Sequence, residues 1–476
     1  MWASDTIRMI EFGTAGIRGP VEETVTPRVA LRVGSAVGRF AVAHGSASTP
    51  AVVIGRDGRT TGSGLVAAVE AGVSAAGSRP IRVGQLPTPA LGFASRGRFG
   101  VMLTASHNPP ADNGIKCFAD GRAFDDEQEA WIEQAVDNEA VAGFDEWGTT
   151  HRETPLTDYR AAVVDYTRER AGGDSPCAGL DIAVDCGNGM AALATPRVLR
   201  DLGANVTALN ANVDGHFPGR PSKPTPETLG DLQAFVADGD ADLGIAHDGD
   251  ADRIVVLDGD GEIIHEDTAV AILAGYYTRR GSSVDGDTTD DPVVVTTPNA
   301  SARIDEAVAA AGGRVERVRL GALHEGIAAA EADGGRVVFA AEPWKHLHSA
   351  FGGWIDGVVS AAVISSLAAS EGLAALREPI TERPYRKVSI DCPERAKTPA
   401  MTALETSLPA AFDDVTLSLD HGVRLDRSDG SWLLVRPSGT EPYIRLYAES
   451  EAVDEIVATA TERIEAAVDD ATETAD

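Results

Sequence analysis

The sequence predicts an α/β protein of several domains that ends in a smaller α+β domain. A chain of 476 residues is too long for one hydrophobic core, so three or four domains are expected. Short apolar strand patterns alternate with helix patterns through most of the chain, and short connections join them. From about residue 383 onward, strand patterns instead surround two helix patterns, which is typical of an α+β domain.

The N-terminal third has the strand–helix–strand order of an α/β domain. Apolar spacing predicts helices over 27–44, 63–76 and 125–137, and strands at 51–54, 81–84 and 101–103. The last strand is a short apolar run, which favours a buried parallel strand. A polar turn follows it, and Asn113-Gly114 predicts a second turn.

The same alternation continues through the middle of the chain. Helices are predicted over 157–171, 266–280 and 300–311, and strands at 181–184, 293–295 and 337–339. Turn-rich segments at 145–156, 172–176 and 373–385 indicate breaks, and 285–291 is expected to be an acidic surface loop. The C-terminal part predicts strands at 386–391, 431–436 and 443–448, and helices at 398–411 and 451–470.

The charge balance limits the possible partners. The chain carries 41 basic and 73 acidic residues, a net charge of −32, and only five of the basic residues are lysines. Nucleic-acid binding is not expected, because it needs a basic surface. Such dense carboxylates resemble the composition of halophilic proteins, although an ordinary acidic cytosolic protein is the simpler alternative. A phosphate could bind only at a local cluster of cations and backbone N–H groups.

The chain shows no sign of a membrane or secreted protein. It contains no 18-residue apolar run, and its N-terminus lacks the apolar region of a secretory signal. The four cysteines are irregularly spaced and form no Cys-x-x-Cys pair. We therefore expect a cytoplasmic protein with reduced thiols, without a membrane partner and without a cysteine-built zinc site.

Ser106 follows the apolar run at 101–103 directly. In open α/β sheets ligands bind beyond the carboxyl ends of strands, which is where this serine is expected. A serine in such a place is usually a turn or capping residue, so position alone does not make it a nucleophile.

Three aspartates follow a second apolar strand. Asp248, Asp250 and Asp252 alternate with small residues, so their carboxylates can converge on one divalent cation. An EF-hand would need Gly at 253 and Glu at 259, where the chain has Arg253 and Gly259. A solvated acidic run is the other alternative, but apolar residues on both sides argue against it. Mg²⁺ is favoured because it binds a few carboxylates together with a phosphate oxygen.

A cluster of cations and hydroxyls lies between two C-terminal strands. Two arginines, two hydroxyls and a glycine turn could hold a phosphate through charge-assisted hydrogen bonds; the set is Arg436, Ser438, Gly439, Thr440 and Arg445. A plain hairpin turn is the alternative. In a chain that repels anions, this concentration of donors favours a phosphate site.

Four segments together resemble the α-D-phosphohexomutases of the phosphoglucomutase/phosphomannomutase family, archaeal type. They are the Phe-Gly-Thr-Ala-Gly-Ile-Arg-Gly segment at 12–19, Thr-Ala-Ser-His-Asn-Pro at 104–109, Asp-Gly-Asp-Ala-Asp-Arg at 248–253 and Arg-Pro-Ser-Gly-Thr-Glu-Pro at 436–442. The resemblance implies three α/β domains with mixed sheets and a smaller C-terminal α+β domain around a central cleft. The corresponding boundaries are 1–150, 155–258, 259–372 and 383–476.

The resemblance also implies roles for individual residues. Ser106 would carry the phosphoryl group, with further catalytic roles for Arg18, His107 and Lys116. Asp248, Asp250, Asp252 and the phosphate on Ser106 would bind one Mg²⁺ per chain. Lys116 could act as general acid/base if its pKa were depressed, or serve only as a charge that neutralises phosphate. Substrate contacts would come from Arg253, Glu342, Lys345 and His346, and the non-reacting phosphate would bind Arg436, Ser438, Gly439, Thr440 and Arg445.

The implied function is a phosphosugar mutase. It would interconvert sugar 1-phosphate and 6-phosphate through a phosphoserine and a bisphosphosugar, with a glucose 1,6-bisphosphate-type activator. The segment 341–346 departs from the family pattern at three positions, so the sugar is open, and phosphoglucosamine mutase and phosphopentomutase are alternatives. A sugar phosphatase is a less favoured alternative. A non-catalytic sugar-phosphate binding protein is disfavoured because the serine and the aspartates are all present.

Overall fold

The protein divides into two compact units. The computed structural model describes residues 12–13, 16–47, 50–138, 140–281, 291–438 and 441–475. The first unit comprises residues 1–269 and 338–377, and the second comprises residues 270–337 and 378–476.

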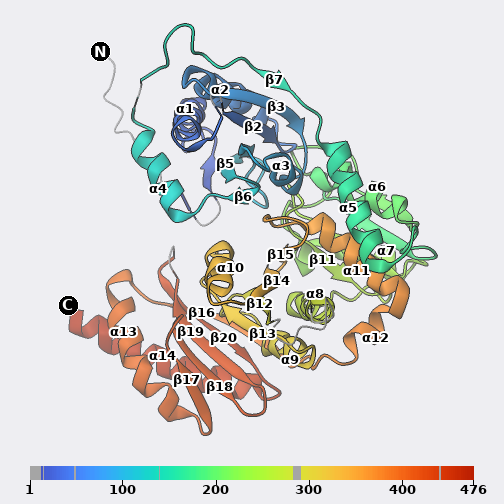
Figure 1. The fold of residues 1–476 in the computed structure, drawn as a ribbon. Coiled ribbons are helices and arrows are strands. Elements are labelled where there is room, and N and C mark those ends of the chain that lie inside the picture. Colours follow the sequence, from blue (N-terminus) through green and yellow to red (C-terminus); the bar gives the residue numbers. More distant parts are fainter. Residues whose placement is uncertain are drawn as a thin grey trace. The chain divides into compact units, whose positions relative to one another are not determined.

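The N-terminal part of the first unit is a mixed sheet in the order β1-β5-β4-β2-β3-β7. Its strands are β1 (Ile17–Pro20), β2 (Ala51–Arg56), β3 (Arg79–Gln85), β4 (Phe99–Leu103), β5 (Asp112–Ala119) and β7 (His151–Arg152), with β6 (Arg122–Ala123) paired to β5. One apolar cluster joins the sheet to helices α1 (Pro27–His44), α2 (Gly62–Ala75) and α4 (Asp126–Ala135). Figure 1 shows α1 and α2 side by side next to these strands. The predicted elements at 27–44, 51–54 and 101–103 are therefore confirmed.

The predicted turn at Asn113-Gly114 is wrong, because both residues lie inside β5. They pair with Gly19 and Arg18 of β1 in an antiparallel ladder. A Cβ atom at Gly114 would lie 2.3 Å from the carbonyl oxygen of Thr104. The glycine therefore allows a close approach of two backbones rather than a turn.

The middle of the first unit is built on a second sheet, in the order β11-β10-β8-β9. Its strands are β8 (Asp181–Asp185), β9 (Asn205–Leu209), β10 (Leu243–Ala246) and β11 (Val255–Leu257). The accompanying helices are α5 (Leu156–Ala171), α6 (Thr195–Asp201) and α7 (Gly230–Ala237). β10 runs parallel to β8 and antiparallel to β11. The aspartate-rich segment is the loop that connects the antiparallel neighbours β10 and β11.

The first unit also contains α3 (Thr88–Ala94), the hairpin of β14 (Arg336–Glu342, of which residues 338–342 belong to this unit) and β15 (Lys345–Leu347), α11 (Gly357–Glu371) and α12 (Leu373–Arg377). The sequence did not indicate α11. Residues from Gly357 to Ala368 are all buried, so most of the helix has no polar face that would give the sequence a helical period.

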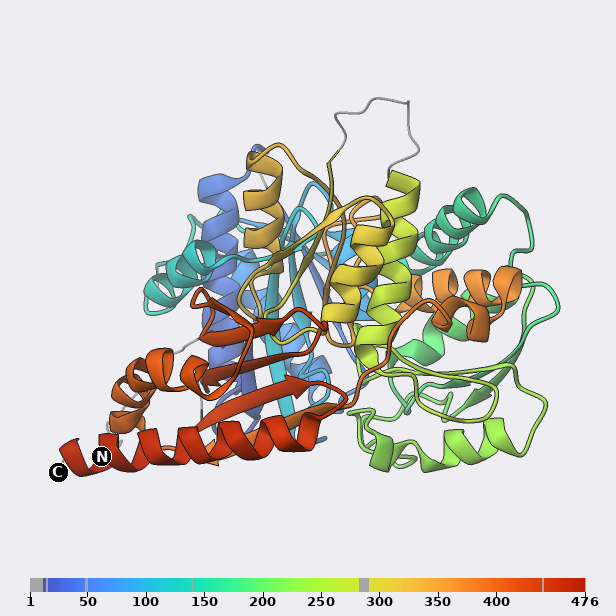
Figure 2. The same cartoon turned by 90° about the horizontal axis from the view of Figure 1, so that it is seen from below.

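The second unit ends in an antiparallel sheet in the order β16-β20-β19-β18-β17. Its strands are β16 (Tyr385–Asp391), β17 (Val415–Ser418), β18 (Val423–Arg427), β19 (Trp432–Pro437) and β20 (Tyr443–Glu449), covered by α13 (Glu394–Ser407) and α14 (Val453–Ala475). Figure 2 shows α14 lying along the strands of this sheet. The remaining elements are α8 (Glu266–Gly281), which begins in the first unit, β12 (Pro292–Thr296), α9 (Ala302–Ala310), β13 (Arg314–Arg317) and α10 (Leu323–Ala332).

Two sequence-based expectations concern segments outside this core. The acidic loop predicted at 285–291 lies outside the described residues, apart from Asp291. Within the described ranges, no helix combines the length and the apolar character that crossing a membrane requires.

A buried ion pair supports the second unit. Arg303 Nη2 lies 2.8 Å from Glu449 Oε1, and both side chains are at most 1% exposed. The other carboxylate oxygen of Glu449 accepts a hydrogen bond of 2.8 Å from Trp432 Nε1.

We expect Glu449→Ala to lower the free energy of unfolding by about 3–5 kcal/mol, because it removes the carboxylate that neutralises a buried guanidinium. The control is Asp454→Ala, which breaks the exposed pair of Asp454 with Arg386 and should cost at most about 1 kcal/mol. Urea denaturation followed by tryptophan fluorescence measures both. Equal losses in the two variants would contradict the importance of the buried pair.

Candidate functional site

Ser106 lies at the carboxyl end of β4 in a left-handed conformation. Its φ is 50°, and the residue is 1% exposed. Its Oγ donates a hydrogen bond of 2.6 Å to Asp248 Oδ2 and lies 3.3 Å from His107 Nδ1. The sequence-predicted serine and the first aspartate of the predicted metal loop are therefore in direct contact, although 142 positions separate them in the chain.

The loop between β10 and β11 brings the three aspartates together. Each of Asp248, Asp250 and Asp252 offers a carboxylate oxygen within 4.8 Å of the others, and all three residues are buried. A Cβ atom at Gly249 would lie 2.6 Å from the carbonyl oxygen of Ser106. The loop can pack against Ser106 only because this position is glycine.

The aspartate cluster fits a divalent cation. Asp250 Oδ1 and Asp252 Oδ1 are buried and accept no hydrogen bond from any described residue. Burial raises the pKa of Asp248, and the neighbouring carboxylates of Asp252 and Asp250 raise it further. Three hard oxygen donors with unsatisfied lone pairs are the set that Mg²⁺ prefers. The cluster is the one group of this kind among the described residues.

Lys116 provides positive charge beside the cluster. Its Nζ lies 3.1 Å from Asp250 Oδ2 and 2.9 Å from Asp252 Oδ2. Burial opposes the charged form of Lys116, but the two carboxylates outweigh it and raise the pKa of the ammonium group. A general acid/base role needs a depressed pKa, so these contacts favour Lys116 as a fixed positive charge.

Two arginines complete the positive side of the site. Arg253 Nε lies 3.8 Å from Asp248 Oδ2, and Arg18 lies on β1 opposite Gly114 of β5. The Nε atoms of both arginines are buried without a hydrogen-bond partner, which leaves donors available for an anion. Burial lowers the pKa of His107 to about 2, and the charges of Arg253 and Arg18 add to this effect. The imidazole of His107 is therefore neutral at physiological pH.

Thr88 joins the aspartate loop to the N-terminal sheet. It begins α3, its Oγ1 donates a hydrogen bond of 2.5 Å to Asp250 Oδ2, and its N–H donates to the Asp250 carbonyl. No role was predicted for Thr88 from the sequence, because the contact is made to a residue 162 positions away.

The loop predicted to bind the sugar is the tight hairpin between β14 and β15. Glu342 pairs with Lys345 across the hairpin, and their side chains are 3.3 Å apart. Trp344 has a φ of 67° and packs against the apolar cluster of the second sheet. These contacts give Trp344 a packing role in the first unit.

His346 is placed differently from the other predicted substrate contacts. It is 1% exposed, and its Nδ1 lies 3.0 Å from Ser360 Oγ. Its Nε2 is buried without a hydrogen-bond partner. Burial lowers the pKa of His346 to about 3, so the ring is neutral.

The predicted phosphate loop lies in the second unit. Arg436 and Arg445 are directly opposite each other in the β19–β20 ladder, and the Nε atoms of both are buried without a partner. Ser438 is buried, and its carbonyl accepts a hydrogen bond of 2.7 Å from Lys397 Nζ. Gly439 and Thr440 lie outside the described residues. The sequence did not indicate Lys397, although the scarcity of lysine was a signal that could have singled it out.

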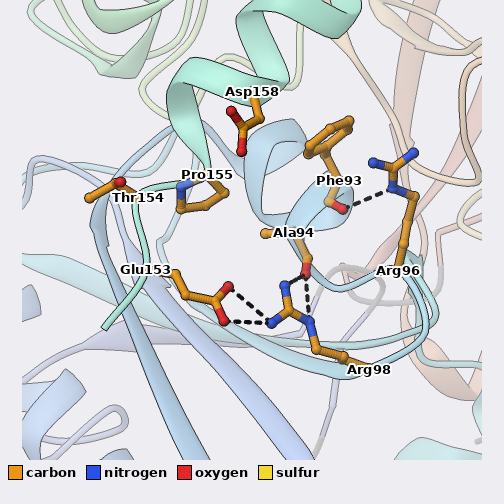
Figure 3. A pocket seen from close by; sticks show the side chains of 8 residues that line it. All are labelled: Phe93, Ala94, Arg96, Arg98, Glu153, Thr154, Pro155 and Asp158. Carbon is orange, nitrogen blue, oxygen red and sulfur yellow. Dashed lines mark hydrogen bonds and ion pairs between the residues drawn. The ribbon is translucent and has the colours of Figure 1, made fainter. Parts of the chain in front are cut away.

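A surface depression of about 440 Å³ lies elsewhere in the first unit and contains none of the predicted site residues. Figure 3 shows its lining, in which Arg98 donates to both carboxylate oxygens of Glu153 at 3.0 Å. The guanidinium of Arg96 lies 3.8 Å from the ring centroid of Phe93. These arginines already have partners, so the depression gives no indication of an anion site.

Comparisons with known proteins identify the family. The domains described as phosphoglucomutase/phosphomannomutase alpha/beta/alpha domain I, alpha/beta/alpha domain II and C-terminal domain match residues 9–142, 158–261 and 390–467. A protein from Methanopyrus kandleri called a probable phosphoglucosamine mutase is 42% identical over 454 residues, covering 93% of this chain and 94% of that protein. A phosphopentomutase from Thermococcus kodakarensis is 38% identical over 450 residues, covering 92% and 93%.

Solved structures agree with this result. A phosphoglucomutase/phosphomannomutase family protein from Burkholderia thailandensis superposes with a TM-score of 0.82 at 26% identity, covering 97% of this chain and 98% of that one. An Aspergillus fumigatus N-acetylphosphoglucosamine mutase, solved with GlcNAc-6P and magnesium, shares the fold with a TM-score of 0.64 at 16% identity, covering 97% and 96%.

The fold and the relatives define a phosphosugar mutase, an isomerase that acts as an intramolecular phosphotransferase. The chain belongs to the phosphoglucomutase/phosphomannomutase family. The predicted family, the predicted multidomain α/β fold with its C-terminal α+β part, and the predicted enzyme class are confirmed.

His247 links the aspartate loop to α6 through hydrogen bonds from its two ring nitrogens. Its Nδ1 lies 2.7 Å from the carbonyl oxygen of Arg253, which can only accept, so Nδ1 carries the hydrogen. Its Nε2 then accepts from Thr195 Oγ1 at 3.0 Å. Burial lowers the pKa of His247 to about 4.

We expect this histidine to make the folded state sensitive to acid. Below pH 6.5 the unfolded chain binds a proton at His247, whereas the folded chain does not until about pH 4. The contribution of neutral His247 to the free energy of unfolding is therefore fully present above pH 6.5. It decreases as the pH drops, by about 2 kcal/mol at pH 5. Urea denaturation at pH 7.5 and 5.0 should show a smaller loss for His247→Gln than for the wild type. His151→Gln, an exposed control on β7, should behave like the wild type.

Proposed function

We propose that the chain moves a phosphoryl group between the 1-position and the terminal hydroxymethyl position of an aldose phosphate, with Ser106 as the phosphoryl carrier. One observation carries the proposal. The Ser106 hydroxyl donates to a buried aspartate of a three-carboxylate cluster at 2.6 Å, and donors of Arg18 and Arg253 without partners are buried in the same unit. A nucleophile, a cation site and anion-binding donors are what phosphoryl transfer needs.

In the proposed reaction the phosphorylated enzyme reacts with a sugar monophosphate. A free sugar hydroxyl attacks the phosphorus on Ser106, an O–P bond to the sugar forms and the Oγ–P bond breaks, while the proton of the sugar hydroxyl ends on Ser106 Oγ. The bisphosphosugar then reorients, and its other phosphoryl group returns to Ser106 as the proton moves from Ser106 Oγ to the released sugar oxygen. In the unphosphorylated state the Ser106 hydroxyl donates its hydrogen bond to Asp248 Oδ2.

The other residues orient the reactants and balance charge. Lys116, Arg18 and Arg253 would stabilise the negative charge that spreads over the transferring oxygens. Mg²⁺, held by Asp248, Asp250 and Asp252 together with a phosphate oxygen on Ser106, would add a Lewis acid at this point. His107 stays neutral and beside Oγ, where it can orient the serine. Arg436, Ser438, Gly439, Thr440 and Arg445 are proposed to hold the phosphate that does not react.

The choice of sugar is proposed to depend on the hairpin at Glu342 to His346. Curated relatives of similar identity are named for glucosamine and for pentose phosphates, so the pattern of similarity favours both. Glu342, Lys345 and the unpaired Nε2 of His346 are the polar groups this loop offers to sugar hydroxyls. Comparing kcat/KM for the 1-phosphates of glucosamine, glucose, mannose and ribose ranks these substrates.

Further expectations belong to the same proposal. They are one Mg²⁺ per chain, activation by a glucose 1,6-bisphosphate-type compound, a cytoplasmic and salt-adapted setting, and domain boundaries near 1–150, 155–258, 259–372 and 383–476.

Ser106→Ala should abolish turnover, because it removes the only atom that the proposal phosphorylates. The wild type, given glucosamine or ribose 1-phosphate with Mg²⁺ and a trace of bisphosphate, should yield the isomeric phosphate without inorganic phosphate in ³¹P NMR spectra. Ser407→Ala, a half-buried serine on α13 in the second unit, serves as control and should keep full activity. Release of inorganic phosphate by the wild type would instead indicate a phosphatase, and full activity of Ser106→Ala would refute the carrier assignment.

Asp250→Asn should weaken Mg²⁺ binding by at least the roughly 100-fold that loss of an outer-shell partner can cost. Isothermal titration of the unphosphorylated protein with Mg²⁺ measures this loss without any need for turnover. Asp238→Asn, an exposed carboxylate after α7, should bind Mg²⁺ like the wild type. Unchanged affinity in Asp250→Asn would show that the cluster is not the metal site.

A further inference from the structure

Arg59 is a fully buried cation that the proposed reaction does not use. It follows β2, and its side chain is 0% exposed. All five of its guanidinium N–H donors have acceptors. Nε donates to Asp57 Oδ2 at 3.0 Å, and the four others donate to backbone carbonyls of the serine loop, at Ser106 (2.9 Å), Asn108 (2.7 Å), Pro109 (2.5 Å) and Asp112 (2.9 Å).

The same network holds the other side of the Ser106 backbone. Asp57 accepts hydrogen bonds from the N–H of Arg59 at 2.9 Å and from Thr104 Oγ1 at 2.7 Å. Thr104 Oγ1 in turn accepts from the N–H of Ser106 at 2.9 Å. Both backbone polar groups of Ser106 therefore end on one buried cluster formed by Asp57, Arg59 and Thr104.

The geometry of this cluster suits the unusual conformation of Ser106. A serine with a φ of 50° is not held there by its own preference, so its surroundings must fix it. The carbonyls that Arg59 binds all face one planar group, which sets the path of the chain from Ser106 to Asp112. The ring of Phe217 lies 5.1 Å from the guanidinium carbon and covers one face of it. A lysine has three donors and no planar fork, so it cannot replace this arrangement.

We propose that Arg59 is a positioning residue for phosphoryl transfer: it fixes the serine loop so that Ser106 Oγ points at Asp248 and the aspartate cluster. The inference rests on the proposed function, because it assigns Arg59 the task of aiming the phosphoryl carrier. It differs from a purely structural role in one respect. Lysine keeps the buried charge but leaves some of these carbonyls without a donor, so some stability is lost. The fully folded variant should nevertheless show a slower chemical step and a more mobile serine loop.

The test compares Arg59→Lys with Arg98→Lys, a control in which the arginine pairs with Glu153 on the surface. We expect Arg59→Lys to lower kcat by about 100-fold, since a misplacement of roughly 1 Å can have that effect. KM should stay within about threefold of the wild type, because the substrate contacts are untouched. Arg98→Lys should keep both constants. Equal kcat values for Arg59→Lys and the wild type, both measured well below their melting temperatures, would overturn the proposal. A fall in kcat that disappears once the unfolded fraction of the variant is corrected for would overturn it as well.

Two further measurements keep the test decisive. Hydrogen exchange should become faster at residues 104–114 in Arg59→Lys and stay unchanged in α1 and α2, and this readout needs no turnover. In Arg59→Ala, millimolar guanidinium should restore part of kcat, whereas the same concentration of sodium chloride should not. If Arg59→Ala fails to fold, Thr104→Val replaces it, with a smaller fall in kcat and the same local exchange pattern.

The outcomes separate this inference from the proposed function. A wild type that moves no phosphate between sugars would refute the proposed function. Unchanged exchange in the serine loop of Arg59→Lys would refute the positioning role, whatever the activity of the wild type.

Discussion

The first unit depends on the mutual repulsion of three buried carboxylates and on the cations that balance them. Asp248, Asp250 and Asp252 are held within 4.8 Å of one another in a chain whose net charge is −32. Lys116 contacts two of the three, and Arg253 approaches Asp248. Lys116 and Arg253 lie beside the aspartates because three carboxylates so close together need positive charge to balance them. In so acidic a chain, a phosphate can bind only where cations are concentrated in this way. Burial keeps His107 beside them neutral by lowering its pKa, and the same concentration of cations lowers that pKa further.

The same loops carry backbone strain. Ser106, Ala251 and Trp344 all have positive φ values although none is glycine, and each such residue costs about 1–2 kcal/mol. The surrounding contacts offset this cost. Ser106 is held by the Arg59 cluster, the aspartate loop by Thr88, and Trp344 by apolar packing. The strained positions are therefore rigid, as the placement of a reacting group requires.

Local patterns predicted most helices, the strands with short apolar runs and the three aspartates, because spacing and burial act over a few residues. The contacts that complete the site were beyond such patterns. Arg59 binds carbonyls about fifty positions away in the chain. The Asn113-Gly114 pair is typical of a turn, and only its pairing with β1 shows that it lies within a strand. α11 is buried on all sides, so it shows no period. The roles of Lys116 and His107 depend on their electrostatic surroundings, which the sequence does not contain.

The contact between Thr88 and Asp250 has a consequence for how such enzymes can diverge. One half of the centre comes from before the turn-rich stretch at 145–156 and the other half from after it. Only glycine fits at position 249, because a Cβ atom there would collide with the backbone of Ser106. A recombinant that joins the N-terminal segment of one relative to the remainder of another would combine a serine loop and an aspartate loop that come from different proteins and need not fit each other. Exchange at this stretch is therefore restricted to parents whose serine and aspartate loops share one geometry. The hairpin at 342–346 must match as well, because the N–H of Ile254 donates to the Trp344 carbonyl at 3.1 Å.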